Sequence, residues 1–153
     1  MAYEYTWYGD SELDTPGLTA FIAATTGGEE RPDGTIFLAG MYVTARSVTG
    51  EDVNPAVSLF GFEHRFTATF RISSRVDDVT EEHATALMVH TVIAFASRFG
   101  GHGVLLFNGE TAVLLHAGDH VVLDAEWEDW TENSEIAPLL DQFDSEVLPQ
   151  PLL

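Results

Sequence analysis

The sequence predicts an α+β fold in which a mainly antiparallel sheet packs against one long helix at about residues 80–99. Three patterns indicate this class. Apolar and polar residues alternate from Phe66 to Ile72, as in a strand with one buried face. Apolar residues at helical spacing precede Gly100-Gly101, and Asn108-Gly109 separates two apolar runs, which is the strongest short signal of a β-hairpin. A short N-terminal helix, a C-terminal β-meander and a loose tail at residues 146–153 complete the prediction.

The N-terminal part of the chain predicts a strand, a short helix and a further strand. Residues 3–8 alternate aromatic and polar side chains, which favours a strand. Asp14 or Thr15 can then cap a short helix that ends at Gly27-Gly28. Residues 35–48 are β-branched and aromatic, so they predict a strand that could fold back as a hairpin.

The long helix is predicted to begin with a capping box at Asp78 to Glu81 and to stop at Gly100-Gly101. His83 and His90 lie on its opposite face, where surface histidines are expected. The predicted core face consists of residues at spacings of three and four: Ala84, Leu87, Met88, Thr91, Val92, Phe95 and Phe99.

Two strands of the meander, 104–107 and 110–116, flank Asn108-Gly109. A third runs from His120 to Asp124, and we expect Glu126 and Glu128 to continue its alternation. A short amphipathic segment follows at residues 136–143.

Acidic residues dominate the charge. The 25 Asp and Glu residues outnumber six basic residues, all Arg, which gives a formal charge of −19 and a pI near 4.2. The last 55 residues hold eleven carboxylates and no Lys or Arg. Nucleic acid and anionic membranes are excluded as partners because both repel such a surface. A cationic protein is the expected partner, although acidity can also serve solubility alone.

A binding site is predicted where aromatic and acidic residues alternate near the C-terminus. Trp is enriched at interface hot spots, and surrounding carboxylates would steer a cationic partner toward it. We expect Trp130 to be an exposed anchor because its neighbours are polar, whereas Trp127 fits the core and an interface equally well. The predicted partner-binding residues are Asp124, Glu126, Trp127, Glu128, Asp129, Trp130 and Glu132.

No catalytic, cofactor or metal site is predicted, so we expect a protein that is not an enzyme. The absence of Cys and Lys excludes thiol chemistry, a Walker lysine and a Schiff base. The glycines at 100–103 precede a strand, unlike a phosphate-binding loop, and indicate a helix stop. Two metal alternatives are disfavoured: Ca²⁺ on Asp124, Glu126 and Glu128, and zinc between His116 and His120.

Residues 1–7 lack the basic and apolar regions of a signal peptide, and no apolar run reaches the ~18 residues that a membrane helix needs. A cytoplasmic location is therefore expected.

Several segments resemble the SitI-type immunity proteins of bacterial polymorphic-toxin systems. The similarity covers roughly residues 2–125 in order and spacing. The segments that carry it are Glu4-Tyr5-Thr6-Trp7, residues 66–71, the long helix with Met88 and Val92, residues 104–110, and Val113-Leu114-Leu115. The length of 153 residues predicts a single immunity-like domain, residues 1–153. The resemblance implies that this domain binds and neutralises a cognate secreted toxin domain. It transfers no functional residue.

Charge and resemblance together predict a stoichiometric inhibitor of a cationic toxin domain. We favour a nuclease, whose basic active-site groove the acidic surface would occlude. Two alternatives remain at this point: an acidic adaptor or secretion chaperone for a basic effector, and a small enzyme.

Overall fold

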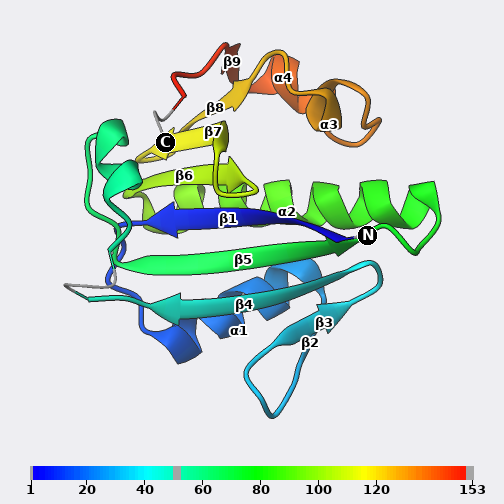
Figure 1. The fold of residues 1–153 in the computed structure, drawn as a ribbon, viewed down its shortest axis with the longest axis horizontal. Coiled ribbons are helices and arrows are strands. Elements are labelled where there is room, and N and C mark those ends of the chain that lie inside the picture. The colour runs from blue at the N-terminus through cyan, green and yellow to red at the C-terminus, as the bar shows by residue number, and fades with distance from the viewer. Residues whose placement is uncertain (1, 50–52, 151–153) are drawn as a thin grey trace.

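The computed structural model describes residues 2–49 and 53–150, and the chain within these ranges forms a nine-stranded sheet (Figure 1). The spatial order of the strands is β2-β3-β4-β5-β1-β6-β7-β8-β9, and every pair is antiparallel except β8 and β9. The strands are β1 (Ala2–Gly9), β2 (Glu29–Glu30), β3 (Ile36–Leu38), β4 (Met41–Ser47), β5 (Phe66–Ser73), β6 (His102–Phe107), β7 (Thr111–Ala117), β8 (His120–Asp124) and β9 (Asp144–Glu146).

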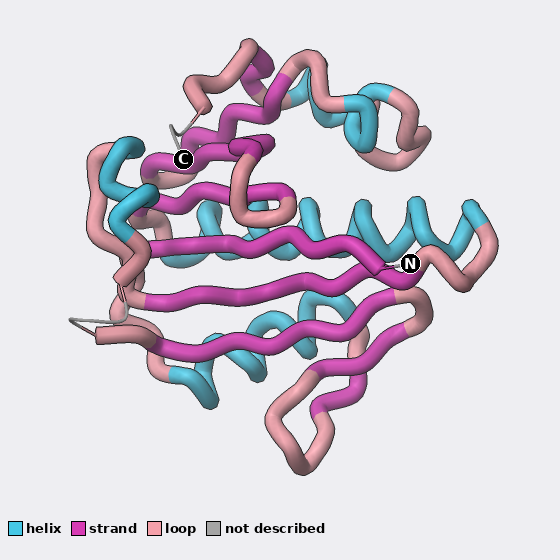
Figure 2. The backbone as a smooth tube through the Cα atoms, viewed as in Figure 1, coloured by secondary structure: helices cyan, strands magenta, loops and turns pink. Residues whose placement is uncertain are grey.

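Two longer helices lie on the same face of this sheet, behind it in Figures 1 and 2. The helices are α1 (Thr15–Thr26), α2 (Asp78–Phe99), α3 (Glu128–Thr131), α4 (Leu139–Gln142) and the 3₁₀ helix η2 (Pro55–Phe60). The sheet with its long helix confirms the predicted α+β class. Among the described residues, no helix is both long and apolar enough to cross a membrane.

The main core lies between the sheet and the two longer helices. Strand β5 alternates buried and partly exposed positions, as its sequence predicted. Trp7 on β1 packs edge-on against Phe95 of α2, with ring centroids 4.8 Å apart. A second, smaller apolar cluster joins β6 and β7 to η2 and includes Val57, Val104 and Leu106.

Helix boundaries follow the local capping chemistry. Asp14 caps α1 by accepting a hydrogen bond from the Gly17 amide at 2.8 Å, which confirms one of the two predicted caps. The cap of α2 is Asp77 rather than Asp78, because Asp77 is extended and accepts from the Thr80 amide at 2.8 Å. The predicted capping box is therefore misplaced by one residue.

Two predicted hairpins form. Asn108 and Gly109 have φ of 50° and 73° between β6 and β7, as a type I′ turn requires. Residues 35–48 fold back as the β3–β4 hairpin, with Gly40 at φ 83° in its turn.

The predicted extension of β8 through Glu126 and Glu128 is wrong. Strand β8 ends at Asp124, whose carboxylate accepts a hydrogen bond from the Glu126 amide at 2.9 Å and turns the chain. Glu128 then begins α3.

The predicted loose tail does not hold for residues 146–150. Glu146 pairs with Asp124 in the sheet, and Leu148 is buried in the smaller apolar cluster. The Gln150 side chain accepts from the Ala112 amide at 2.7 Å and donates to its carbonyl at 3.1 Å. Residues 151–153 of the predicted tail lie outside the described residues.

Candidate functional site

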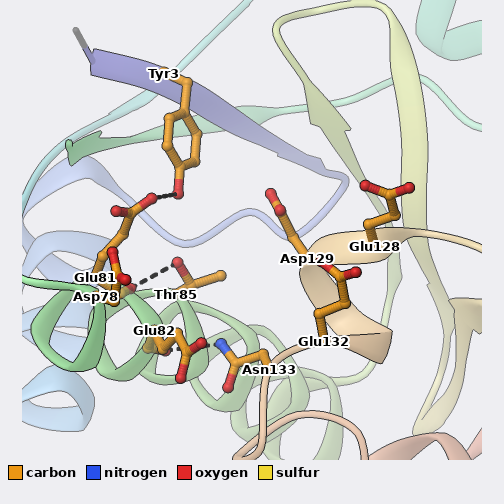
Figure 3. Close-up of a pocket in the computed structure, with 9 residues that line it drawn as sticks. All are labelled: Tyr3, Asp78, Glu81, Glu82, Thr85, Glu128, Asp129, Glu132 and Asn133. Carbon is orange, nitrogen blue, oxygen red and sulfur yellow. Dashed lines mark hydrogen bonds between the residues drawn. The ribbon is translucent and has the colours of Figure 1, made fainter.

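An acidic pocket of about 160 Å³ opens between the N-terminal half of α2 and the short helix α3 (Figure 3). Tyr3, Thr85 and Asn133 complete its lining. In the part of the chain that the structure describes, no Lys, Arg or His lines it. Six carboxylate residues, hereafter the acidic pocket residues, surround it: Asp78, Glu81, Glu82, Glu128, Asp129 and Glu132.

Helix α2 supplies one wall. Asp78 and Glu81 stand in its first turn, where the positive end of the helix dipole favours negative charge. The Tyr3 hydroxyl, from the start of β1, donates a hydrogen bond to Glu81. This contact holds the Glu81 carboxylate toward the pocket, as Figure 3 shows.

Helix α3 supplies the opposite wall, and its position is fixed from the sheet. The Tyr5 hydroxyl donates to the Asp129 carboxylate and accepts from Trp127 Nε1 at 3.0 Å. These two hydrogen bonds of the Tyr5 hydroxyl therefore connect α3 and the residue before it to β1.

Asn133 joins the two walls. Its side-chain amide donates to the Glu82 backbone carbonyl at 2.9 Å, and its side chain is buried. Its side-chain oxygen also accepts from the Glu135 amide at 3.0 Å. The segment that follows α3 is thereby hydrogen-bonded to α2.

The two tyrosines act as hydrogen-bond donors rather than bases. Burial, together with the neighbouring Glu81, raises the pKa of Tyr3, and burial with the charge of Asp129 raises the pKa of Tyr5. Both hydroxyls stay protonated at neutral pH. The pocket thus presents carboxylate acceptors but no activated nucleophile paired with a base, an arrangement that suits binding of a cation.

The charges of the chain are distributed unevenly over the sheet. Five of the six arginines precede α2 in the sequence, in or beside β2 to β5, and the sixth, Arg98, stands in the last turn of α2. The acidic pocket lies at the opposite end of α2 from Arg98. The carboxylates of the pocket therefore lack a cationic residue in its lining.

In a comparison with protein-family models, the chain matches the SitI3-like family over residues 3–134. The chain belongs to this family of SitI-type immunity proteins. The match includes the sheet through β8, both longer helices and all six acidic pocket residues. Comparisons with curated proteins and with solved structures gave no match. Membership of the SitI3-like family implies a toxin as partner and is consistent with an inhibitor that is not an enzyme.

The structure of this SitI3-like protein brings three of the seven predicted partner-binding residues together. Glu128, Asp129 and Glu132 line the acidic pocket. Glu126 is exposed outside the lining, and Asp124 is buried, where it accepts hydrogen bonds from the Glu126 and Leu148 amides.

The two tryptophans have structural contacts. Trp127 is half-buried and packs against Phe107, with ring centroids 4.8 Å apart. The prediction that Trp130 is exposed is wrong, because its side chain is 0% exposed. Its ring stacks on Tyr5 at 5.7 Å, and its Nε1 donates to the Val113 carbonyl at 2.9 Å. The single-turn helix α3 turns Trp130 inward although its sequence neighbours are polar.

The sequence analysis missed the contribution of α2. In the sequence, Asp78 and Glu81 predict a capping box, and Glu82 carries no separate signal of a binding site. An acidic helix start is a common stabilising feature, so nothing local separates it from a binding site. The signal of a shared site that is left in the sequence is that the start of α2 and the α3 segment are both acidic, although they lie about 50 residues apart.

The two disfavoured metal alternatives gain no support. Asp124 is buried and Glu128 lies in α3, so the three proposed Ca²⁺ ligands do not share a strand face. His116 Nε2 accepts from Trp7 Nε1 at 3.3 Å, while His120 faces Asp144 at 3.1 Å. Within residues 2–49 and 53–150, no three His, Asp or Glu side chains are placed to hold one metal ion.

The glycine-rich segment 100–103 ends α2, as predicted. Gly100 has φ 70° and donates to the Ala96 carbonyl at 2.9 Å. At Gly103, a Cβ atom would lie 2.0 Å from His116 Nε2, so this position must stay glycine for the buried histidine to fit.

Proposed function

We propose that this protein is a cytoplasmic immunity protein that neutralises a cognate cationic toxin domain by binding it at the acidic pocket. The observation that carries the proposal is the pocket itself: six carboxylates from two helices, with no basic residue in the lining, in a chain of the SitI3-like family. The residues proposed to contact the toxin are the six acidic pocket residues, with Glu126 at the flank.

Electrostatics favours a guanidinium or ammonium group as the moiety that enters the pocket. Carboxylates held close together repel one another, and a cationic side chain placed between them relieves that repulsion. Arg also matches carboxylates geometrically through paired N–H donors. The fixed positions of Glu81 and Asp129, each held by a tyrosine hydroxyl, reduce the entropy that ordering on binding would cost.

A nuclease is the toxin class that this surface fits best. Nucleases bind phosphates, so their substrate grooves carry Arg and Lys residues. The carboxylates around the acidic pocket can pair with these Arg and Lys residues in place of the phosphate backbone. Occlusion of the groove would inhibit the enzyme in a 1:1 complex without any chemistry in the immunity protein.

Trp127 and Trp130 have a different role in this proposal from the one predicted from sequence. Trp130 stabilises α3 through its hydrogen bond to the Val113 carbonyl of β7. Trp127 donates to the Tyr5 hydroxyl, which in turn donates to the Asp129 carboxylate and so orients it. Asp124 shapes the turn that leads into α3. These residues support the binding surface without contacting the toxin.

Co-expression with the protein encoded by the adjacent open reading frame tests the function. We expect a 1:1 complex on purification and loss of the toxin's nuclease activity at one equivalent of the immunity protein. A complex that leaves the toxin fully active would favour the adaptor or chaperone alternative. Turnover by the purified chain alone in a substrate screen would favour the enzyme alternative.

A further inference from the structure

A second hollow of about 320 Å³ lies at the turn between β3 and β4, lined chiefly by apolar and aromatic atoms with one guanidinium. We propose that it binds a peptide segment of another protein that presents a carboxylate next to an aliphatic side chain. This site shares no lining residue with the acidic pocket, so the inference goes beyond the proposed function and does not depend on it.

The two aromatic residues in the lining of the hollow are exposed. Phe37 is 44% exposed and Tyr42 is 40% exposed, and the two are directly paired across β3 and β4. Both positions point away from the face that α1 and α2 cover, because their sequence neighbours Ile36 and Val43 are fully buried in the main core. Adjacent exposed aromatics on an open sheet face are typical of a binding surface.

Arginine accompanies both aromatic rings. The Arg31 guanidinium lies 4.2 Å from the centre of the Phe37 ring, and the Arg71 guanidinium lies 6.0 Å from that of Tyr42. Arg71 lines the hollow, and among residues 2–49 and 53–150 no Asp or Glu does. In a chain with 25 acidic residues and six basic ones, this hollow is a local exception to the acidic surface.

The positive charge of Arg71 in the lining therefore favours a ligand with an anionic group. Arg71 has one carboxylate partner, Glu4, at 3.4 Å, and both side chains are nearly half exposed. Such an exposed pair contributes little, so an incoming carboxylate can replace Glu4 or share the guanidinium with it. The volume is at the lower end of ligand sites, which suits one or two residues of a peptide rather than a cofactor.

The apolar part of the ligand is selected by the rest of the lining. The apolar surface that lies next to the guanidinium is formed by Phe37, Met41, Tyr42 and Val76.

A second copy of the chain is a poorer occupant of the hollow, because two molecules of charge −19 repel each other.

The test uses the intact protein and two dipeptide probes, acetyl-Leu-Glu-amide and acetyl-Leu-Gln-amide, in an amide chemical-shift titration. We expect saturable shifts at Gly40 to Tyr42 and at Arg71 to Ser73 with the Glu probe. The Gln probe should bind at least roughly fivefold more weakly than the Glu probe, because its side chain lacks the negative charge of the carboxylate. The variant Arg71→Gln should reduce binding of the Glu probe to the level of the Gln probe.

Arg65→Gln is the matched control. Arg65 is an exposed, ion-paired arginine six residues earlier, roughly 20 Å along the strand direction, and its loss should leave the affinity unchanged. Equal binding of both probes, or an equal effect of the two Arg variants, would overturn the inference. It would also be overturned by no saturation at about 50 mM probe, a limit that corresponds to negligible affinity. Shifts at these amides that depend on protein concentration alone would show that a second copy occupies the hollow instead.

Discussion

Replacement of Trp130 by Ala tests the largest disagreement between the sequence and the structure. An exposed binding anchor could be removed without loss of stability, and only the affinity for the partner would fall, by about 2 kcal/mol or more. The structure instead places the whole side chain in the core, stacked on Tyr5 and bonded to the Val113 carbonyl. Trp130→Ala is therefore expected to destabilise the fold.

The expected magnitude follows from the contacts that are lost. Truncation of a fully buried Trp to Ala costs about 3–5 kcal/mol, which already includes the cavity that remains. The Val113 carbonyl also loses its donor, which places the cost toward the upper end of that range. For a chain of this length, such a loss lowers the melting temperature by roughly 6–20 °C.

Thermal unfolding followed by far-UV circular dichroism, with urea unfolding as a second measure, determines the change. Trp130→Phe should fall between the parent and Trp130→Ala, because it keeps most of the ring but loses the hydrogen bond. Val79→Ala is the control, since Val79 is 77% exposed and its truncation should cost less than about 0.5 kcal/mol. If Trp130→Ala melts within about 2 °C of the parent, less than 1 kcal/mol by the same scaling, the burial of Trp130 is refuted.

Three further predictions concern pH, salt and metal. Burial lowers the pKa of His116 to about 4, whereas the unfolded chain titrates near 6.5, so the unfolded state takes up the proton first as the pH falls. The free energy of unfolding should then decrease by roughly 3 kcal/mol between pH 6.5 and 4 through this residue, and urea unfolding of His116→Gln should lack that part of the decrease. The association rate with the toxin should fall as salt rises from about 50 to 500 mM while dissociation changes less; a salt-independent association rate would assign the acidity to solubility. A chelator should leave the melting temperature unchanged, and a drop of more than about 5 °C, of the order of 1 kcal/mol or more, would reveal a structural metal.

Local chemistry in the sequence was sufficient to predict most of the sheet and both longer helices. The cap at Asp14 and the Asn108-Gly109 turn each act within a few residues, so their signals survive without tertiary information. Strand β5 was predictable because one face is buried and the other is not, which imposes a period of two.

Segments whose structure depends on distant partners were not predictable. Strand β9 is three exposed polar residues with no apolar alternation, and only its pairing with β8 defines it. Helix α3 is four residues long, shorter than the repeat that would reveal a helical face. The polar neighbours of Trp130 in the sequence consequently predict a loop rather than a buried helix.

The candidate site was predicted in part for the same reason. The carboxylates of α3 were recognised from local composition, whereas those of α2 come from a segment about 50 residues earlier. The alternation in the sequence predicts that Tyr3 and Tyr5 lie in a strand. It does not predict that their hydroxyls hold the carboxylates of Glu81 and Asp129. The tertiary contacts of Tyr5 with Asp129 and of Asn133 with Glu82 bring these groups into one pocket.

The affinity of the toxin for two charge-matched double variants tests the central claim most directly. Glu128→Gln/Glu132→Gln removes two carboxylates from the acidic pocket, and Glu63→Gln/Asp119→Asn removes two exposed carboxylates elsewhere on the chain. Isothermal titration calorimetry should show at least about tenfold weaker binding for the pocket variant, or 1.4 kcal/mol, and a change within about twofold for the other. Equal affinities for the two variants would contradict the account, because the toxin would then respond only to overall charge or would bind at a different surface.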